Sequence, residues 1–138
     1  MTDPDCIFCR ILANQIPSAR IHEDEHAIAF LDIAPFEKGH ALVIPRLHAA
    51  RLTDLPADEL QRLMPAVQRT AAILLRRLPC DGFNLLQSNG TCATQVVMHV
   101  HFHVIPRWNG REMRWLPGKY DAPGEMQALA ARLRNPPD

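Results

Sequence analysis

The chain has 138 residues, 47% of them hydrophobic, and its 15 lysines and arginines balance its 15 acidic residues. This length suits a single domain that buries a core, residues 1–138. The balanced charge disfavours a nucleic-acid partner, and no apolar run is long enough to cross a bilayer. The N-terminus lacks the basic start and apolar core of a signal peptide, so we expect a cytoplasmic protein that binds neither nucleic acid nor membrane.

The first part of the chain predicts one short helix and three strands. Apolar residues at helical spacing predict the helix over residues 6–13. Two strands follow at residues 20–23 and 26–31, around a charged turn typical of a hairpin. The second strand alternates alanines with bulky residues, so one of its sides is small. A loop with proline and glycine then leads to an apolar strand over residues 40–44.

The second part predicts a long helix, two more strands and a tail. Thr53 or Asp54 is a candidate N-cap for the long helix, and Pro65 is expected to kink or split it. Residues 83–87 resemble a strand, and residues 125–133 a short helix. Hairpins on both sides of the long helix predict an α+β fold, with an antiparallel sheet and helices on one face.

Three histidines alternate with apolar residues near the C-terminal end. His99, His101 and His103 have the period of a β-strand, which places their imidazoles in a row on one face. Pro106 is expected to end this ladder, because proline cannot donate to a neighbouring strand. Such a row is compatible with a half-exposed strand, with three ligands of a catalytic metal, or with nucleophilic attack of a neutral imidazole on phosphorus.

The four cysteines do not suggest a disulfide framework. Cys6 and Cys9 form a C-x-x-C pair at the extreme N-terminus, which favours metal binding over redox chemistry. Cys80 and Cys92 are isolated and are interpreted as small buried or half-buried residues.

The stretch Gln95-x-Val-x-His-Val-His-Phe-His-Val-Ile105 resembles the signature of the histidine triad (HIT) family. Asn89-Gly90-x-x-Ala93-x-Gln95 extends the match upstream, and residues 5–11 and 29–45 resemble the family in the same order. The resemblance covers about residues 5–107 and leaves a tail of residues 108–138. It implies a five-stranded antiparallel sheet with one long and one short helix, joined to a second copy in a homodimer.

The resemblance also implies a reaction. His101 would attack the α-phosphate of a purine nucleotide, and water would hydrolyse the nucleotidyl-histidine to release AMP. His103 would contact the phosphate or the leaving group, and Gln95 would position phosphate oxygens. The substrate would be a nucleoside phosphoramidate or a dinucleoside polyphosphate such as Ap4A, or the nucleotide would pass to another acceptor. The alternative is a non-catalytic module that binds nucleotide and zinc.

The remaining predicted contacts follow from the same resemblance. Asp32 would bind the ribose hydroxyls, although a turn-capping role is equally ordinary for it. Asn89, Gly90 and the backbone N–H groups of residues 93–96 are candidates to approach the phosphate. Four side chains would form an apolar purine slot, with core packing as the alternative for each: Phe8, Ile11, Phe30 and Ile33.

A structural zinc ion is implied by the resemblance to bacterial-type members. It would be held by Cys6, Cys9, His48 and His99, of which spacing alone supports only the cysteine pair. Three further histidines are interpreted as ordinary surface or satisfied polar residues: His22, His26 and His40. Departures from the family pattern leave the preferred leaving group open: Ser88, Thr94 and Val96.

Overall fold

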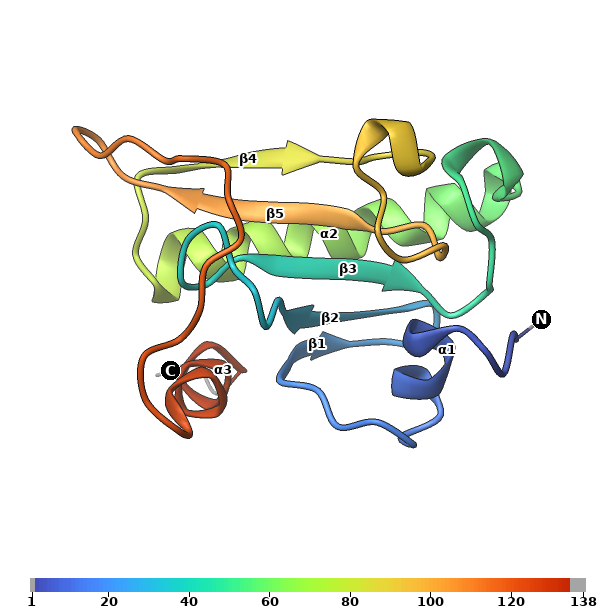
Figure 1. The fold of residues 1–138 in the computed structure, drawn as a ribbon, viewed down its shortest axis with the longest axis horizontal. Helices are drawn as coiled ribbons and strands as arrows, with labels where there is room; N and C mark the ends of the chain where they lie inside the picture. Colours follow the sequence, from blue (N-terminus) through green and yellow to red (C-terminus); the bar gives the residue numbers. More distant parts are fainter. Residues whose placement is uncertain (1, 135–138) are drawn as a thin grey trace.

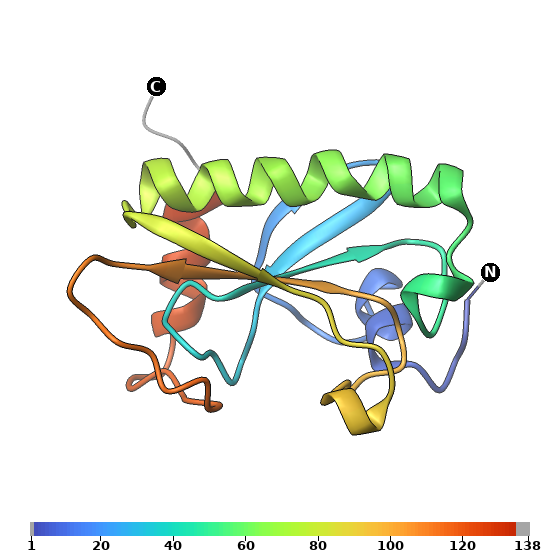
Figure 2. The same cartoon turned by 90° about the horizontal axis from the view of Figure 1, so that it is seen from above.

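The computed structural model describes residues 2–134, and its core is an antiparallel sheet that lies between helices (Figures 1 and 2). The strands are β1 (Arg20–Glu23), β2 (Ala27–Leu31), β3 (Ala41–Pro45), β4 (Gly82–Leu86) and β5 (Phe102–Arg107). The helices are α1 (Ile7–Leu12), α2 (Ala57–Arg77) and α3 (Glu125–Arg134), with short 3₁₀ turns η1 (Leu52–Asp54) and η2 (Thr91–Ala93). Within residues 2–134, no helix combines the length and apolarity that a bilayer crossing requires.

The sheet has the order β1-β2-β3-β5-β4, and every neighbouring pair is antiparallel. This confirms the predicted α+β fold with a five-stranded antiparallel sheet. The last strand in the chain, β5, lies between β3 and β4, so residues from both halves of the sequence flank it. His103 pairs with Leu42 on one side and with Leu86 on the other.

The two faces of the sheet are covered by different helices, as Figure 2 shows for α2 and α1. Ala27 and Ala29 of β2 belong to the core under α2, where their small side chains let the long helix approach. Ile28 and Phe30 alternate with them and pack on the other side against residues of α1. The predicted small and bulky sides of β2 are therefore confirmed, but the prediction that helices cover one face only is wrong.

Helix α2 is one uninterrupted helix of 21 residues. It begins after Pro56, and the predicted caps Thr53 and Asp54 lie instead in η1. Pro65 does not split the helix, because it lies on the exposed side, where water can bond the carbonyl left without an N–H partner. Helix α3 packs beside β1 and α2 at the far end of the sheet (Figure 1).

The histidine strand is shorter than the alternation predicts. Strand β5 begins only at Phe102, so His99 and His101 precede it in irregular backbone. The N–H of Val100 donates to the carbonyl of Ala49 rather than to a sheet partner, at 2.7 Å. The alternation itself persists, since Val100 and Val104 are buried in the core under α2 while the imidazoles gather on the other side.

Pro106 does not end the ladder, because it pairs with Phe83 and the strand continues to Arg107. The carbonyl of Arg107 accepts a hydrogen bond from the backbone N–H of Asp81, which directly precedes β4. The backbone groups of successive residues in a strand point to opposite neighbours, so the backbone nitrogen of Pro106 is directed toward β3. The pairing of β5 with β3 has already ended at Val104. The missing N–H of the proline therefore costs no ladder bond.

Candidate active site and metal centre

Three imidazoles from β5 and from the segments that precede β3 and β5 meet on one face of the sheet. The rings of His101 and His103 lie 4.9 Å apart, and those of His40 and His103 lie 5.1 Å apart. His40 directly precedes β3, whose neighbour in the sheet is β5. His40 and His101 are buried, and Asp32 approaches His40 at 3.7 Å from the end of β2.

A chain of hydrogen bonds assigns the tautomers of His40 and His103. The backbone N–H of Phe36 donates to Nδ1 of His40 at 3.0 Å, so this nitrogen carries a lone pair. The proton of neutral His40 is then on Nε2, which lies 2.9 Å from Nδ1 of His103 and donates to it. His103 in turn carries its proton on Nε2. Burial lowers the pKa of His40 to about 4 and that of His103 to about 3, so both are neutral near pH 7.

His101 has the opposite tautomer. Its Nδ1 lies 2.7 Å from the carbonyl of His99 and must donate to it, which leaves Nε2 with a free lone pair. Burial also lowers the pKa of His101, with the carbonyl bond and Asp32 acting against this shift. The site thus places a neutral nitrogen with a lone pair beside a second ring that carries a proton on Nε2. That pair suits nucleophilic attack with proton donation to a leaving group.

The second cluster brings together the four predicted metal ligands. Cys6 and Cys9 come from the start of α1, His48 follows β3, and His99 precedes β5; their ligand atoms all lie within 4.8 Å of one another. Cys6 Sγ and Cys9 Sγ lie 3.4 and 3.6 Å from His99 Nδ1, and the two Nδ1 atoms are 3.2 Å apart. A tetrahedral zinc ion separates such ligands by about 3.3–3.6 Å.

The protonation of the two histidines makes this cluster suited to a cation. Nε2 of His99 donates to the carbonyl of Pro45 at 2.9 Å, and Nε2 of His48 faces the carboxylate of Asp3 at 3.8 Å. Both Nδ1 atoms therefore direct lone pairs into the cluster, where they repel each other unless a cation lies between them. Burial raises the pKa of the Cys6 thiol, so a metal is needed to keep it ionised at neutral pH.

Asp32, His40 and His103 form another group that is close enough for a metal. Their donors do not suit one, because Nδ1 of His40 already accepts the Phe36 N–H and its Nε2 carries the proton. A metal at that Nε2 would have to displace this proton from a ring whose other nitrogen is occupied. The geometry therefore fits a hydrogen-bonded relay at this group and a metal at the cysteine cluster.

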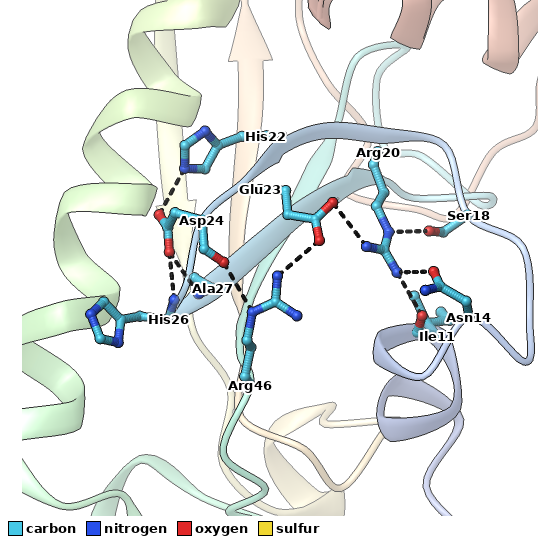
Figure 3. A network of polar contacts seen from close by, with 10 residues as sticks. All are labelled: Ile11, Asn14, Ser18, Arg20, His22, Glu23, Asp24, His26, Ala27 and Arg46. Atoms are coloured by element: carbon cyan, nitrogen blue, oxygen red, sulfur yellow. Dashed lines mark hydrogen bonds and ion pairs between the residues drawn. The ribbon is translucent and has the colours of Figure 1, made fainter.

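A polar network fixes α1 on the sheet (Figure 3). The guanidinium of Arg20 in β1 donates to the carbonyl of Ile11 at 2.7 Å and to Asn14 at 2.9 Å, which caps the end of the helix. Glu23 bridges Arg20 and Arg46, at 3.1 and 2.9 Å. Because Arg46 directly follows β3, the network joins the helix that carries the cysteines to the segment that leads to His48.

Hydrogen bonds between its own residues hold much of the loop of residues 88–96. The N–H groups of Ala93, Thr94 and Gln95 donate to carbonyls of Gly90 and Thr91, so they are not free to bind an anion as predicted. The buried Gln95 side chain accepts from Gly90 at 2.7 Å and donates to the carbonyls of Ala50 and Val97 at 2.6 and 3.0 Å. Its amide protons are thus used inside the protein, where they hold the loop beside the histidine segment, and the role of Gln95 in positioning phosphate oxygens stays a prediction.

Two other predicted polar residues also have structural partners. Asn89 Oδ1 accepts the N–H of Leu52 at 2.7 Å, while its amide group bonds Gln87. Asp32 Oδ1 accepts the N–H of Ala34 at 2.9 Å, as a turn-capping aspartate does, and its Oδ2 faces His40. Asp32 thus lies beside the histidine site, and the contacts of both side chains with a nucleotide stay predictions.

The predicted purine slot is only partly assembled. Phe8, Ile11 and Phe30 are buried together in the core cluster under α1. This agrees with core packing, the alternative given for each of them. The ring of Phe8 lies 5.9 Å from that of His99 and 5.2 Å from that of His101, and so connects the metal cluster to the histidine site. Ile33 stands apart from them and is 77% exposed.

Sequence reasoning missed three contributors: His40, the Phe36 N–H, and Asp3 behind His48. His40 is a buried, satisfied polar residue, which is one of the two predicted alternatives, but its direct contact with His103 was not predicted. A signal was present, because His40 alternates in step with Leu42 and Ile44 and so shares their face, but only the pairing of β3 with β5 brings that face to His103. All four cysteines are free, and Cys92 is exposed rather than buried.

The fold and the alternating histidines define a protein of the histidine triad class. The family model for the HIT domain matches residues 13–110, and the chain belongs to this family. It is 48% identical over 105 residues to an uncharacterized HIT-like protein of Methanocaldococcus jannaschii, covering 76% of this chain and 81% of that protein.

Two further relatives extend the similarity over nearly the whole chain. An adenosine 5′-monophosphoramidase of Schizosaccharomyces pombe is 40% identical over 131 residues, 93% of this chain and 95% of the relative. The crystal structure of a zinc-bound histidine triad family protein from Mycobacterium smegmatis superposes with a TM-score of 0.85 at 37% identity. It covers 94% of this chain and 91% of that one.

Proposed function

We propose that the protein is a nucleotide hydrolase that acts on the α-phosphate of a purine nucleotide and releases AMP. The observation that carries the proposal is the tautomer of His101, whose Nδ1–H is held by the His99 carbonyl while Nε2 keeps its lone pair. An imidazole held in this way is prepared to attack phosphorus, and a merely structural histidine would not need it.

In the proposed reaction, His101 Nε2 forms a bond to the α-phosphorus as the bond from phosphorus to the leaving group breaks. The leaving group takes the proton from Nε2 of His103, whose tautomer is set by His40. Water then attacks the nucleotidyl-histidine, returns a proton to the site, and frees His101 and AMP. Asp32 would bind the ribose, and Asn89 would border the phosphate; Ile33, with Phe8, Ile11 and Phe30 behind it, would border the base.

A phosphoramidate is the favoured substrate, because the near-full-length relative from S. pombe is named an adenosine 5′-monophosphoramidase. When the P–N bond of such a substrate breaks, the leaving group is an amine, which needs a proton as it departs. The proton on His103 meets that need. Dinucleoside polyphosphates are the second substrate class, since attack at the α-phosphorus also releases AMP from them.

We further propose a structural zinc ion at Cys6, Cys9, His48 and His99. The lone pairs and spacings described above support it, as does the zinc-bound relative from M. smegmatis. When bound, the ion would supply cross-linking rather than chemistry, since two thiolates and two imidazoles fill a tetrahedral shell. The residues would thereby hold α1 and the His99 backbone, whose carbonyl orients His101.

The test compares hydrolysis of adenosine 5′-phosphoramidate and diadenosine tetraphosphate by the wild type and His101→Ala. We expect AMP from the wild type and a loss of kcat by about 10⁴-fold or more in the variant, because the nucleophile is gone. His26→Ala, which changes a partly exposed histidine of the β1–β2 hairpin, is the control and should retain full activity.

Two outcomes would contradict the proposal. Substantial AMP release by His101→Ala would exclude a nucleotidyl-histidine at this position. A wild type that binds AMP yet cleaves neither substrate would favour the non-catalytic nucleotide- and zinc-binding module. The ratio of the two wild-type rates would otherwise decide between the phosphoramidate and polyphosphate substrates.

A further inference from the structure

The C-terminal tail forms hydrogen bonds and ion pairs with residues 35–39, the loop that precedes His40 and that we call the 35–39 loop. The N–H of Gly118 donates to the carbonyl of Pro35 at 2.8 Å, and the N–H of Gly39 donates to the hydroxyl of Tyr120 at 3.1 Å. Between them, the ammonium of Lys38 bonds two carboxylates of the tail, Asp121 at 2.5 Å and Glu125 at 2.7 Å. Figure 1 shows the tail passing this loop before it enters α3.

The inner side of the same loop holds the imidazole of His40. The N–H of Phe36 bonds His40 Nδ1 at 3.0 Å, and the N–H of His40 bonds the carbonyl of Glu37 at 2.9 Å. The ring of Phe36 lies parallel to that of His103, with centroids 6.5 Å apart. The loop is therefore held between the tail on one side and the two histidines on the other.

The close fit of tail and loop depends on glycines. A Cβ atom at Gly118 would lie 2.7 Å from the carbonyl oxygen of Pro35, which is too close for any other residue without movement of the backbone. Gly39 has φ of +100°, which only glycine adopts readily, and a Cβ there would lie 2.5 Å from Leu78. The backbones of tail and loop thus approach each other at Gly118, which admits no side chain, while Gly39 gives the loop its turn against Leu78, the residue that follows α2.

We propose that Tyr120, Lys38, Asp121 and Glu125 form a latch that positions the His40–His103 pair. These are positioning residues: they act through the 35–39 loop and touch neither histidine. The latch keeps the Phe36 N–H on His40 Nδ1, which keeps the His40 proton on Nε2 and the His103 proton on its own Nε2. If the loop moves away, His40 can turn or change tautomer, and His103 then loses the arrangement in which it can protonate a leaving group.

The catalytic part of this inference rests on the proposed hydrolase function, but the tautomers can be observed without it. The test uses full-length protein labelled with ¹⁵N in histidine and measures ring tautomers by NMR, together with kcat and KM for adenosine 5′-phosphoramidate. The variants are Tyr120→Phe, Lys38→Met and their combination, and Lys38→Arg is the conservative rescue.

Arg62→Met is the matched control, because Arg62 also bridges two carboxylates, Asp58 and Glu59, on the exposed face of α2. It should behave as the wild type. In the double variant we expect His103 to populate both neutral tautomers. We also expect kcat to fall by about three- to tenfold with KM within about twofold, since misplacement of a reacting group costs rate more than binding. Lys38→Arg, in contrast to Lys38→Met, should keep the wild-type tautomer of His103 and the wild-type kcat.

The latch would be refuted if the double variant kept the wild-type tautomers, whether or not its kcat fell. It would also be refuted if Arg62→Met altered the His103 signals as much as Lys38→Met does. A wild type that hydrolyses nothing would refute the proposed function instead, and the tautomer comparison would still decide whether the latch exists.

Discussion

The backbone N–H of Phe36 sets the protonation of two imidazoles. By donating to His40 Nδ1 it moves the His40 proton to Nε2, and His103 must then accept at Nδ1. Burial keeps both rings neutral, because an uncompensated charge is costly in a site with little water. Desolvation is the largest cause of the lowered pKa of His40. The charge of Asp32 raises this pKa, and the neighbouring His101 lowers it further.

These lowered pKa values predict a loss of stability in mild acid. An unfolded histidine titrates near pH 6.5, whereas His40 and His103 in the folded protein resist protonation until about pH 4 and about pH 3. The unfolded state therefore binds more protons between these values, and the free energy of unfolding falls as the pH drops from about 6.5 to about 4. Each histidine contributes up to about 1.4 kcal/mol per pH unit, measurable by urea denaturation at several pH values.

The variant His40→Asn isolates one of these contributions. Its free energy of unfolding should depend less steeply on pH in this window, while His26→Asn, which alters a partly exposed histidine, should keep the wild-type slope. Both variants retain the Cys6–His99 cluster, so a difference between their slopes reports on His40. Equal slopes would show that His40 is not held neutral in the folded protein.

At the scale of elements, α1 depends on its contacts for its structure. It has six residues, and a helix this short is not stable alone in water. Phe8 anchors it in the core on its inner side, Arg20 caps its C-terminal end, and the cysteines join it to His48 and His99. Burial of one aromatic ring and a partly exposed guanidinium contribute less than a bound structural metal would, so the cysteine cluster is the strongest candidate tether.

Removal of the cysteines is therefore expected to release zinc and loosen α1. The purified wild type should carry about one zinc per chain by elemental analysis, and Cys6→Ala/Cys9→Ala should carry none. Loss of a tightly bound ion should lower the free energy of unfolding by roughly 3–5 kcal/mol and speed amide exchange in residues 7–13. Cys80→Ala, which removes a buried cysteine outside the cluster, should keep the zinc. A wild type free of zinc after metal-replete purification would disprove the site.

At the scale of the molecule, the sheet is incomplete at β4. This strand has a partner on one side only within residues 2–134, and its Phe83 and Leu85 are exposed. They line an apolar groove together with α2 residues that include the exposed Met64 and Leu75. Apolar grooves beside an unpaired strand are suited to association, so this surface is where we place the proposed homodimer contact.

Leu85→Lys should disrupt the dimer, because a charge in the centre of an apolar interface is left without a partner. Light scattering after size exclusion should give twice the chain mass for the wild type and a shift to the single chain mass in the variant, with self-association at least about thirtyfold weaker. Leu116→Lys changes another exposed leucine, in the tail, and should leave the mass unchanged. A wild type that runs as a monomer at all concentrations would refute the homodimer.

The amino-acid pattern alone predicted the helices and strands and most of the residues that gather in the two clusters, with His40 the exception. The strands, the long helix and the terminal helix lie within a few residues of their predicted positions, because each carries its own apolar period. The C-x-x-C pair predicted a metal cluster, and the histidine alternation predicted a shared face, since both depend on neighbours in the chain.

How those residues meet depends on the folded chain. The placement of β5 between β3 and β4 brought His40 to His103, and no local pattern shows which strands pair. The bond from Val100 to the distant Ala49 accompanies the late start of the histidine strand, at Phe102. The same long-range contacts directed the Gln95 amide to Ala50 and the tail to the 35–39 loop. Hydrogen bonds to backbone groups then fixed each proton. Those of Phe36 and His99 are close in the chain to the rings they bond, and that of Pro45 is distant, but none of these bonds could be predicted without the folded backbone.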